Sequence, residues 1–136
     1  MTNTQLDLTA DILDARDIIA RVEELEESKT WHEEVHGAGD WADAYPQEAQ
    51  ELDTLAAILE DLKGYGGDEQ WRGDWYPVIL IRETHFTDYV QEMLEDCGEI
   101  PRDLPHYIHI DWERTARDVK VDYGSVTVDG VEYLYR

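Results

Sequence analysis

The sequence predicts an α+β fold of about four helices with a small antiparallel sheet that contains a C-terminal β-hairpin. Three observations predict this class. Apolar residues recur every three or four positions in several stretches, which is the periodicity of amphipathic helices. Near the C-terminus, apolar and polar residues instead alternate on both sides of an Asp-Gly pair, which is typical of a hairpin. With 136 residues, 42% of them hydrophobic, the chain has enough apolar material for a core.

The first expected helix covers residues 9–27. Ile12, Ala15 and Ile19 are spaced by three or four positions, and aspartates near the start of this segment suit the positive end of a helix dipole. Residues 28–45 contain two glycines and two tryptophans, and we expect a loop or hinge there.

The second expected helix begins at Pro46, because proline suits the first helical position. Its apolar stripe is leucine-rich and ends before Gly64, a residue that commonly stops a helix. The stripe consists of Leu52, Leu55, Leu59 and Leu62. Residues 64–76 then predict a Gly-rich loop that carries aromatic side chains.

The C-terminal half predicts one strand and two further helices before the hairpin. Residues 77–82 (PVILIR) are typical of a buried strand, and a third helix is expected over residues 84–96, with Gly98 as its stop. Residues 107–110 are expected to form a short strand or an extended lead-in, and Asp111 is the predicted N-cap of a fourth helix.

The hairpin is centred on Asp129-Gly130, a pair that favours a tight turn. Its alternating apolar residues are Val126 and Val128 before the turn and Val131, Tyr133 and Tyr135 after it. We therefore expect an N-terminal helical pair (residues 1–63) and a C-terminal α+β module (residues 64–136), either as two units or as one compact unit.

The charge of the chain restricts its partners. Thirty-three acidic residues against eleven basic ones give a net charge of −22. Such a surface repels nucleic acid and anionic membranes and attracts basic surfaces, so we expect a DNA-binding protein as the partner and neither DNA nor a membrane.

Acidic side chains spaced by three or four residues on a helix lie about 5–6 Å apart, within reach of the separation of neighbouring phosphates on one DNA strand. We therefore predict that the acids of the expected helices take the place of phosphates in a partner's DNA-binding groove. The alternative is an ordinary solvated surface, which is the usual role of charged runs. The candidate residues are Asp11, Asp14, Asp17, Glu23, Glu24, Glu27, Glu48, Glu51, Glu60, Asp61, Asp111, Glu113, Asp118 and Asp122.

The C-terminal region carries a more specific pattern. Residues 110–118 (IDWERTARD) are followed by Asp122-Tyr123 and then by residues 129–133 (DGVEY), and the chain ends at Arg136. Together with the upstream Ile81-Arg82-Glu83, this pattern resembles the ArdA antirestriction proteins over residues 78–136.

The resemblance implies a protein that is carried by a phage or another mobile element and acts in the cytoplasm of the host bacterium. It also implies an acidic, elongated homodimer that mimics bent B-form DNA and blocks type I restriction–modification enzymes, without catalysis and without a cofactor. The C-terminal strand of the hairpin, or the helix before it, is the expected place of the two-fold contact.

A zinc hydrolase is the sharpest alternative. Residues 32–36 (HEEVH) match H-E-x-x-H, which on a helix places two histidines one turn apart with Glu33 as a general base. Gly39 suits an extended version of that motif, but Ala42 stands where a third histidine is needed. We expect a loop without catalytic function at this position.

The aromatic residues of the two expected loops allow two interpretations. They either cover a thin core or provide a surface for a partner, since Trp and Tyr dominate interaction hot spots. The residues concerned are Trp31, Trp41, Trp71, Trp75 and Tyr76. In the second interpretation, the protein is an interaction module of a phage and its acidity serves solubility.

The single cysteine, Cys97, excludes an intrachain disulfide and fits a reducing cytoplasm. We expect it to be a small buried apolar residue at the end of the third helix. No stretch approaches the roughly 18 apolar residues of a membrane span, and the first residues lack the basic and apolar regions of a signal peptide.

Overall fold

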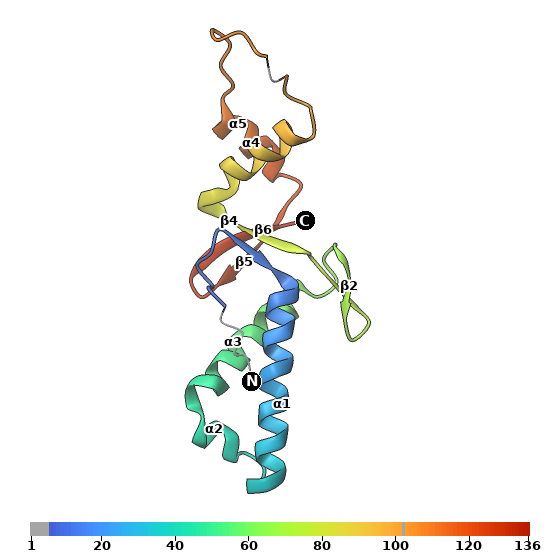
Figure 1. The fold of residues 1–136 in the computed structure, drawn as a ribbon, viewed down its shortest axis with the longest axis vertical. Coiled ribbons are helices and arrows are strands. Elements are labelled where there is room, and N and C mark those ends of the chain that lie inside the picture. The colour runs from blue at the N-terminus through green and yellow to red at the C-terminus, as the bar shows by residue number, and fades with distance from the viewer. Residues whose placement is uncertain (1–5, 102) are drawn as a thin grey trace.

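The computed structural model describes residues 6–101 and 103–136 of the chain. Its centre is a four-stranded antiparallel sheet in the order β1-β4-β6-β5 (Figure 1). These strands are β1 (Ile12–Asp14), β4 (Ile79–Arg82), β5 (Gly124–Val128) and β6 (Val131–Tyr135). Strands from both ends of the chain thus form one sheet.

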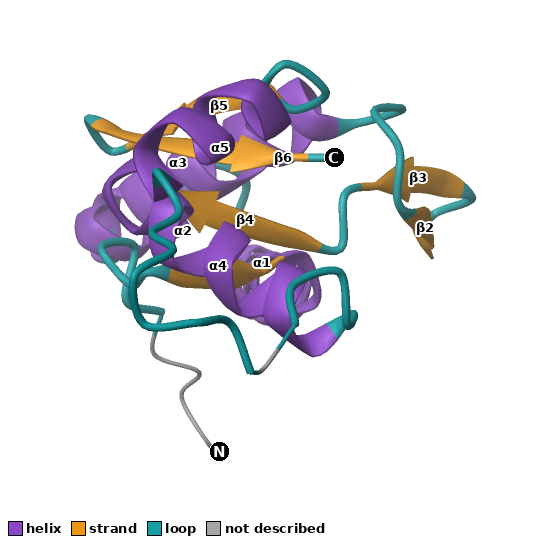
Figure 2. Ribbon diagram, turned by 90° about the horizontal axis from the view of Figure 1, so that it is seen from above, coloured by secondary structure: helices purple, strands orange, loops and turns teal. Residues whose placement is uncertain are grey.

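Helices cover both faces of this sheet and lie at opposite ends of the elongated molecule (Figures 1 and 2). On one face lie α1 (Ala15–His36), α2 (Asp40–Ala44) and α3 (Pro46–Leu62). The other face carries a short 3-10 helix (Glu83–His85), α4 (Phe86–Asp96) and α5 (Trp112–Lys120). The fold is therefore a helix–sheet–helix stack along the long axis of the molecule.

Alternation along the strands explains this arrangement, because neighbouring residues of a strand point to opposite faces. Leu80 and Tyr133 belong to the larger core, together with residues of α1 and α3. The next residue of each strand, Ile81 and Leu134, belongs to the smaller core under α4 and α5. β4 and β6 therefore each contribute to both cores.

A second, two-stranded sheet projects from the side of the molecule (Figure 1). It consists of β2 (Asp68–Trp71) and β3 (Asp74–Tyr76). Gly67 precedes β2 with φ +68°, and a Cβ atom at this position would lie 1.8 Å from the carbonyl oxygen of Tyr76. Only glycine permits the close approach at the base of this hairpin.

The predicted α+β class is confirmed, and several elements agree with the sequence. The second helix begins at Pro46, and the C-terminal hairpin turns at Asp129 and Gly130 with φ 51° and 82°. Asp111 is the N-cap of α5, since its carboxylate accepts a hydrogen bond from the backbone nitrogen of Arg114 at 3.1 Å. The strand expected over residues 77–82 is β4.

Three expectations were wrong. The first helix does not start near residue 9, because residues 12–14 form β1, and it extends to His36 through the expected loop. Residues 64–76 contain the β2–β3 hairpin instead of a plain loop. Cys97 is exposed. Of the two alternatives for residues 107–110, the strand is excluded, and residues 108–110 lead into α5 without regular secondary structure.

Candidate protein-interaction surface

The candidate acids nearest the N-terminus do not form the expected helical row. Asp11 precedes β1, and its carboxylate lies 3.8 Å from the ring of His85. Asp14 is the N-cap of α1 and accepts a hydrogen bond from the backbone nitrogen of Arg16 at 2.9 Å. The Arg16 side chain also donates to Asp14, which lowers the pKa of this carboxyl group. Of these three acids, only Asp17 lies on the helix.

Two other candidate acids pair with Arg21, Glu24 within α1 and Glu51 across to α3. The guanidinium of Arg21 on α1 donates to the carboxylate of Glu51 on α3 at 2.8 Å and to that of Glu24 at 2.7 Å. Arg21 is half-buried, and its hydrogen bonds to Glu51 raise the pKa of its guanidinium. Glu24 and Glu51 therefore contribute mainly to the fold.

Most of the remaining candidates are exposed and have no ion pair within the described part of the chain. They lie on α1, on α3 and on or just after α5: Asp17, Glu23, Glu27, Glu60, Asp61, Glu113, Asp118 and Asp122. Glu48 is half-buried in the first turn of α3, and Asp111 is exposed but serves as the cap of α5.

A row of exposed acids lies on α4, and it was not among the candidate residues predicted from the sequence. Asp88, Glu92, Glu95 and Asp96 are all exposed and are spaced by one and two helical turns. The signal is present in the sequence, because these acids alternate at helical periodicity with the apolar residues that define the helix. Those apolar residues include Phe86, Tyr89, Val90 and Met93.

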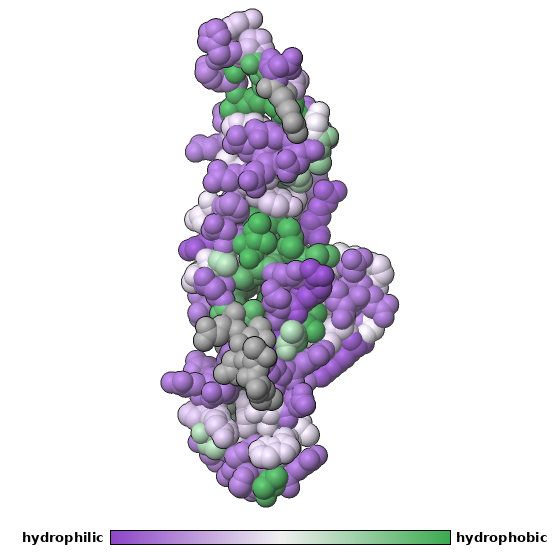
Figure 3. Space-filling model, in the orientation of Figure 1, coloured by the Kyte–Doolittle hydropathy of each residue, from purple (hydrophilic) through white to green (hydrophobic). Residues whose placement is uncertain are grey.

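Several basic residues are already paired with acids inside the molecule. Arg72 donates to Glu26 and lies over the Trp71 ring, 4.0 Å from the ring centroid. Lys63 lies 3.6 Å from the carboxylate of Asp74. These pairs leave the exposed acids as the dominant charge of the surface, and hydrophilic side chains cover most of the face in Figure 3.

The HEEVH segment forms the last turns of α1, so the expectation of a loop was wrong. His32 is buried, and its Nε2 atom lies 2.7 Å from the carboxylate of Asp40 at the start of α2. The His36 ring lies against it at 4.4 Å between centroids, tilted by 34°. The Glu33 carboxylate accepts a hydrogen bond from the backbone nitrogen of Gly39 at 2.9 Å. These contacts connect α1 to α2.

Within residues 6–101 and 103–136, no three His, Cys, Asp or Glu side chains are grouped in a way that could hold a metal ion. The sequence of this segment matches the zinc motif. In the structure, His32 and His36 contact each other, and His32 and Glu33 contact Asp40 and Gly39 where α1 meets α2.

The aromatic residues divide between the two interpretations. Trp41 and Tyr76 are buried in the larger core, and Trp71 packs partly against it. Trp31, at 66% exposure, and Trp75, at 51%, are open to solvent. Among the five aromatic residues of the expected loops, a partner surface is therefore restricted to these two tryptophans.

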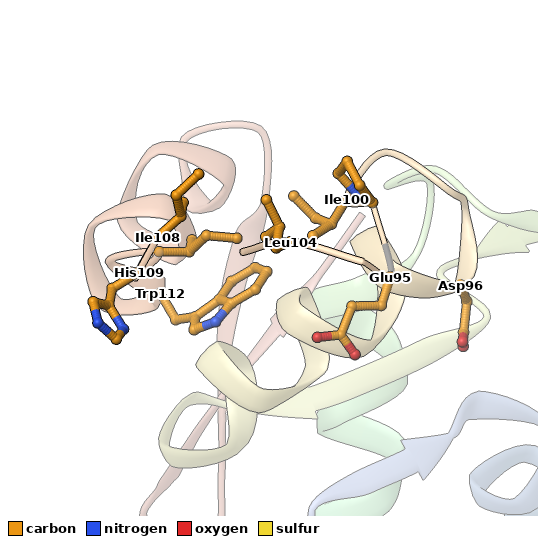
Figure 4. A pocket seen from close by; sticks show the side chains of 9 residues that line it. Glu95, Asp96, Ile100, Leu104, Ile108, His109 and Trp112 are labelled. Carbon is orange, nitrogen blue, oxygen red and sulfur yellow. The ribbon is translucent and has the colours of Figure 1, made fainter. Parts of the chain in front are cut away.

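A cavity of about 720 Å³ lies at the tip of the molecule (Figure 4). It is bordered by the end of α4, the loop that follows α4 and the start of α5. Its lining combines apolar side chains with polar ones, among them Glu95 and Asp96 at one side. Over the described part of the chain, no helix is both long and apolar enough to cross a membrane.

The fold and this surface define a small, strongly acidic α+β protein in which exposed carboxylates lie on helices at both ends. The chain belongs to the ArdA family of antirestriction proteins, because the family model for antirestriction protein (ArdA) matches residues 2–133. No match was found among curated proteins or solved structures. The family match includes the N-terminal half, beyond the resemblance over residues 78–136.

Proposed function

We propose that this antirestriction protein acts as a DNA mimic on a type I restriction–modification enzyme. Its exposed carboxylates take the places of phosphates in the basic groove of the enzyme and exclude DNA. The protein contributes no catalysis and needs no cofactor for this inhibition, because occupying the groove is sufficient.

The observation that carries this proposal is the distribution of exposed acids along the molecule. Exposed carboxylates lie on α1 and α3 at one end and on α4 and α5 at the other, on a chain with a net charge of −22. DNA carries its charges as a regular array along its length, and an acidic surface that extends over an elongated protein provides the same kind of array. A single acidic patch would not do so.

Binding of this kind is distributed over many weak contacts. An exposed ion pair contributes about 0.2–1 kcal/mol, so the loss of one acid should weaken inhibition less than about fivefold. Salt should weaken it strongly, because exposed charges are screened beyond about 10 Å at 0.1 M ionic strength.

The direct test is DNA cleavage by a purified type I restriction enzyme, titrated with the protein at low and at near-physiological salt. We expect inhibition close to stoichiometric that weakens as salt increases and is relieved by excess non-cleavable duplex. The absence of inhibition at both salt concentrations would contradict the proposal.

Charge variants test the geometry. The variant E23Q/E27Q/E60Q/D61N removes four exposed acids of α1 and α3 and should weaken inhibition about tenfold or more. The matched control, D68N/E69Q/D129N/E132Q, removes four exposed acids of strands and turns. Equal losses in the two variants would mean that net charge alone determines binding.

The homodimer belongs to the same proposal. β5 is an edge strand of the central sheet, so its outer backbone groups are available for the two-fold contact expected near the hairpin. Sedimentation analysis should give twice the chain mass of 15.8 kDa. A mass equal to that of one chain would contradict the dimer without affecting the inhibition test.

A second candidate function rests on the exposed tryptophans. Trp75 lies on the projecting β2–β3 hairpin and Trp31 on α1, and both are large exposed side chains of the kind found in hot spots. If the protein binds its partner mainly through these residues, Trp75→Ala should abolish binding while the acid variants leave it unchanged. DNA mimicry predicts the opposite order.

A further inference from the structure

The cavity at the tip of the molecule contains apolar side chains that belong to neither core. Ile100, Leu104, Ile108 and Trp112 converge on the cavity (Figure 4). None of the four belongs to the two groups of packed apolar residues that the structure describes. Ile108 is 47% exposed, and the other three are half-buried. These side chains therefore form an open apolar pocket at the tip of the molecule.

The charged side chains at this pocket that the structure describes are acidic. Glu95 and Asp96, from the last turn of α4, line one side, and His109 lies on the opposite side (Figure 4). Among the described residues that line the pocket, none is lysine or arginine. An apolar interior beside two carboxylates is complementary to an apolar side chain that has basic neighbours.

We propose that this pocket binds one branched aliphatic side chain of a basic protein segment, with the flanking Lys or Arg residues of that segment placed at Glu95 and Asp96. The inference rests on the proposed function in one respect, namely that the partner is a basic DNA-binding protein. It adds a contact that DNA itself does not make.

Such an anchor has a physical consequence that phosphate mimicry lacks. Charge pairs at the surface weaken with salt, whereas burial of an aliphatic side chain is not screened. The pocket therefore provides a part of the binding affinity that persists when salt weakens the electrostatic part. It also favours, among basic partners of equal charge, those that present an aliphatic side chain.

The test uses the full chain and three fluorescent synthetic peptides of equal length. The first has one leucine between pairs of arginines, the second has serine in place of the leucine, and the third keeps the leucine but replaces the arginines by glutamates. Fluorescence anisotropy at low and high salt measures each dissociation constant. We expect the leucine peptide to bind about tenfold or more tightly than the serine peptide, with this ratio retained at high salt.

Two protein variants locate the binding. Ile108→Ser should remove the preference for leucine, because it replaces an exposed lining residue by a polar one. The matched control is Val121→Ser, which alters an aliphatic residue of 82% exposure at the end of α5 and should leave the preference intact. Circular dichroism checks that both variants are folded. The variant E95Q/D96N should weaken the binding of both arginine-containing peptides by the same factor.

Equal affinities for the leucine and serine peptides, or no measurable binding of either, would overturn the inference. A preference for leucine that persists in Ile108→Ser would overturn it as well, because the anchor would then lie elsewhere. The cleavage titration separates this result from the proposed function. Salt-sensitive inhibition without any preference for the leucine peptide would leave DNA mimicry standing and remove only the pocket.

Discussion

The side chain of Tyr133 connects the N-terminal segment to the centre of the sheet. Its ring is fully buried in the larger core. Its hydroxyl is shared between the carbonyl oxygens of Leu8, at 2.9 Å, and Ala10, at 2.7 Å. These contacts fix the residues that lead into β1, which pairs with β4 at the edge of the sheet. A single phenol group thus joins segments more than one hundred residues apart.

Tyr133→Phe should lower the free energy of unfolding by about 1–3 kcal/mol, since it removes a buried donor and leaves carbonyl groups without it. Thermal or denaturant unfolding of the variant and the wild type measures the difference. Thr127→Val changes a hydroxyl on an exposed position of the neighbouring β5 strand and is the matched control. An unchanged stability of Tyr133→Phe would show that water replaces the phenol at no cost.

Buried and half-buried tyrosines also make the protein sensitive to alkaline pH. Desolvation raises the pKa of Tyr76, Tyr89 and Tyr133 above the ordinary value. A raised pKa in the folded state means that folding favours the protonated phenol. The resulting stability is complete below about pH 10, where the unfolded chain keeps its protons, and is lost as pH rises through the folded-state values.

We therefore expect the unfolding midpoint to fall as the pH increases above about 10. Ultraviolet absorbance of tyrosinate should show part of the tyrosines titrating late, together with unfolding. In Tyr133→Phe this late fraction should be smaller. A midpoint that is constant through the alkaline range would contradict the assignment of these phenols to the core.

At the scale of elements, the β2–β3 hairpin depends on the glycine before it. The hairpin is fixed at its base where the Gln70 side chain donates to the carbonyl oxygen of Tyr76 at 2.7 Å, next to Gly67. The backbone at residue 67 leaves no room for a side chain, so the position of the hairpin and of its exposed Trp75 depends on this glycine.

Gly67→Ala should displace the hairpin and destabilise the protein by more than the roughly 1–2 kcal/mol of a left-handed conformation alone. The matched control is Gly73→Ala, because Gly73 also has positive φ, but a Cβ atom added there would have no other atom within 4 Å. Differential scanning calorimetry measures the loss of stability, and tryptophan fluorescence reports a displaced hairpin. Equal losses in both variants would exclude the close approach at Gly67.

How much of the fold the sequence predicts depends on how local the signal is. Pro46, Asp111 and the Asp129-Gly130 pair act through their own backbone conformation, and each was assigned correctly. The strand at residues 12–14 was not, because Ile12 continues a helical spacing and β1 is defined only by pairing with β4. Sequence patterns report local preferences, whereas this pairing joins Ile12 to Ile81, in the other half of the chain.

For the candidate surface, too, only local features could be predicted from the sequence. These were the net charge, the acidic composition and the helical position of Glu23 and Glu27. The roles of Glu24 and Glu51 could not be predicted, because both depend on Arg21, which pairs with Glu24 on its own helix and with Glu51 on α3. The packing of the helices determines which acid is exposed to solvent and which acid forms an ion pair that stabilises the fold.

At the scale of the whole molecule, the N-terminal helices and the C-terminal strands share one core. Ile18 and Leu55 belong to the same packed group as Val128 and Tyr133. We propose that residues 1–63 and 64–136 unfold as one cooperative unit. Denaturant unfolding followed by circular dichroism and by tryptophan fluorescence should give coincident transitions. Two separate transitions would assign the two segments to independent units.

The net charge of −22 should also make stability depend on salt. Like charges on the compact state repel one another, and salt screens this repulsion more effectively in the folded chain than in the expanded one. We expect the unfolding midpoint to rise between about 0.01 M and 0.15 M sodium chloride. A control with sucrose at constant ionic strength separates screening from general solvent effects. A midpoint that falls with salt would indicate that the ion pairs outweigh the repulsion.

The alternation of strand residues between two cores has a consequence for how such a protein can change over generations. Leu80 and Tyr133 face one helical group while Ile81 and Leu134 face the other, so the packing of one end is largely insulated from that of its opposite. A lineage can therefore redesign the α4–α5 tip without repacking α1 and α3.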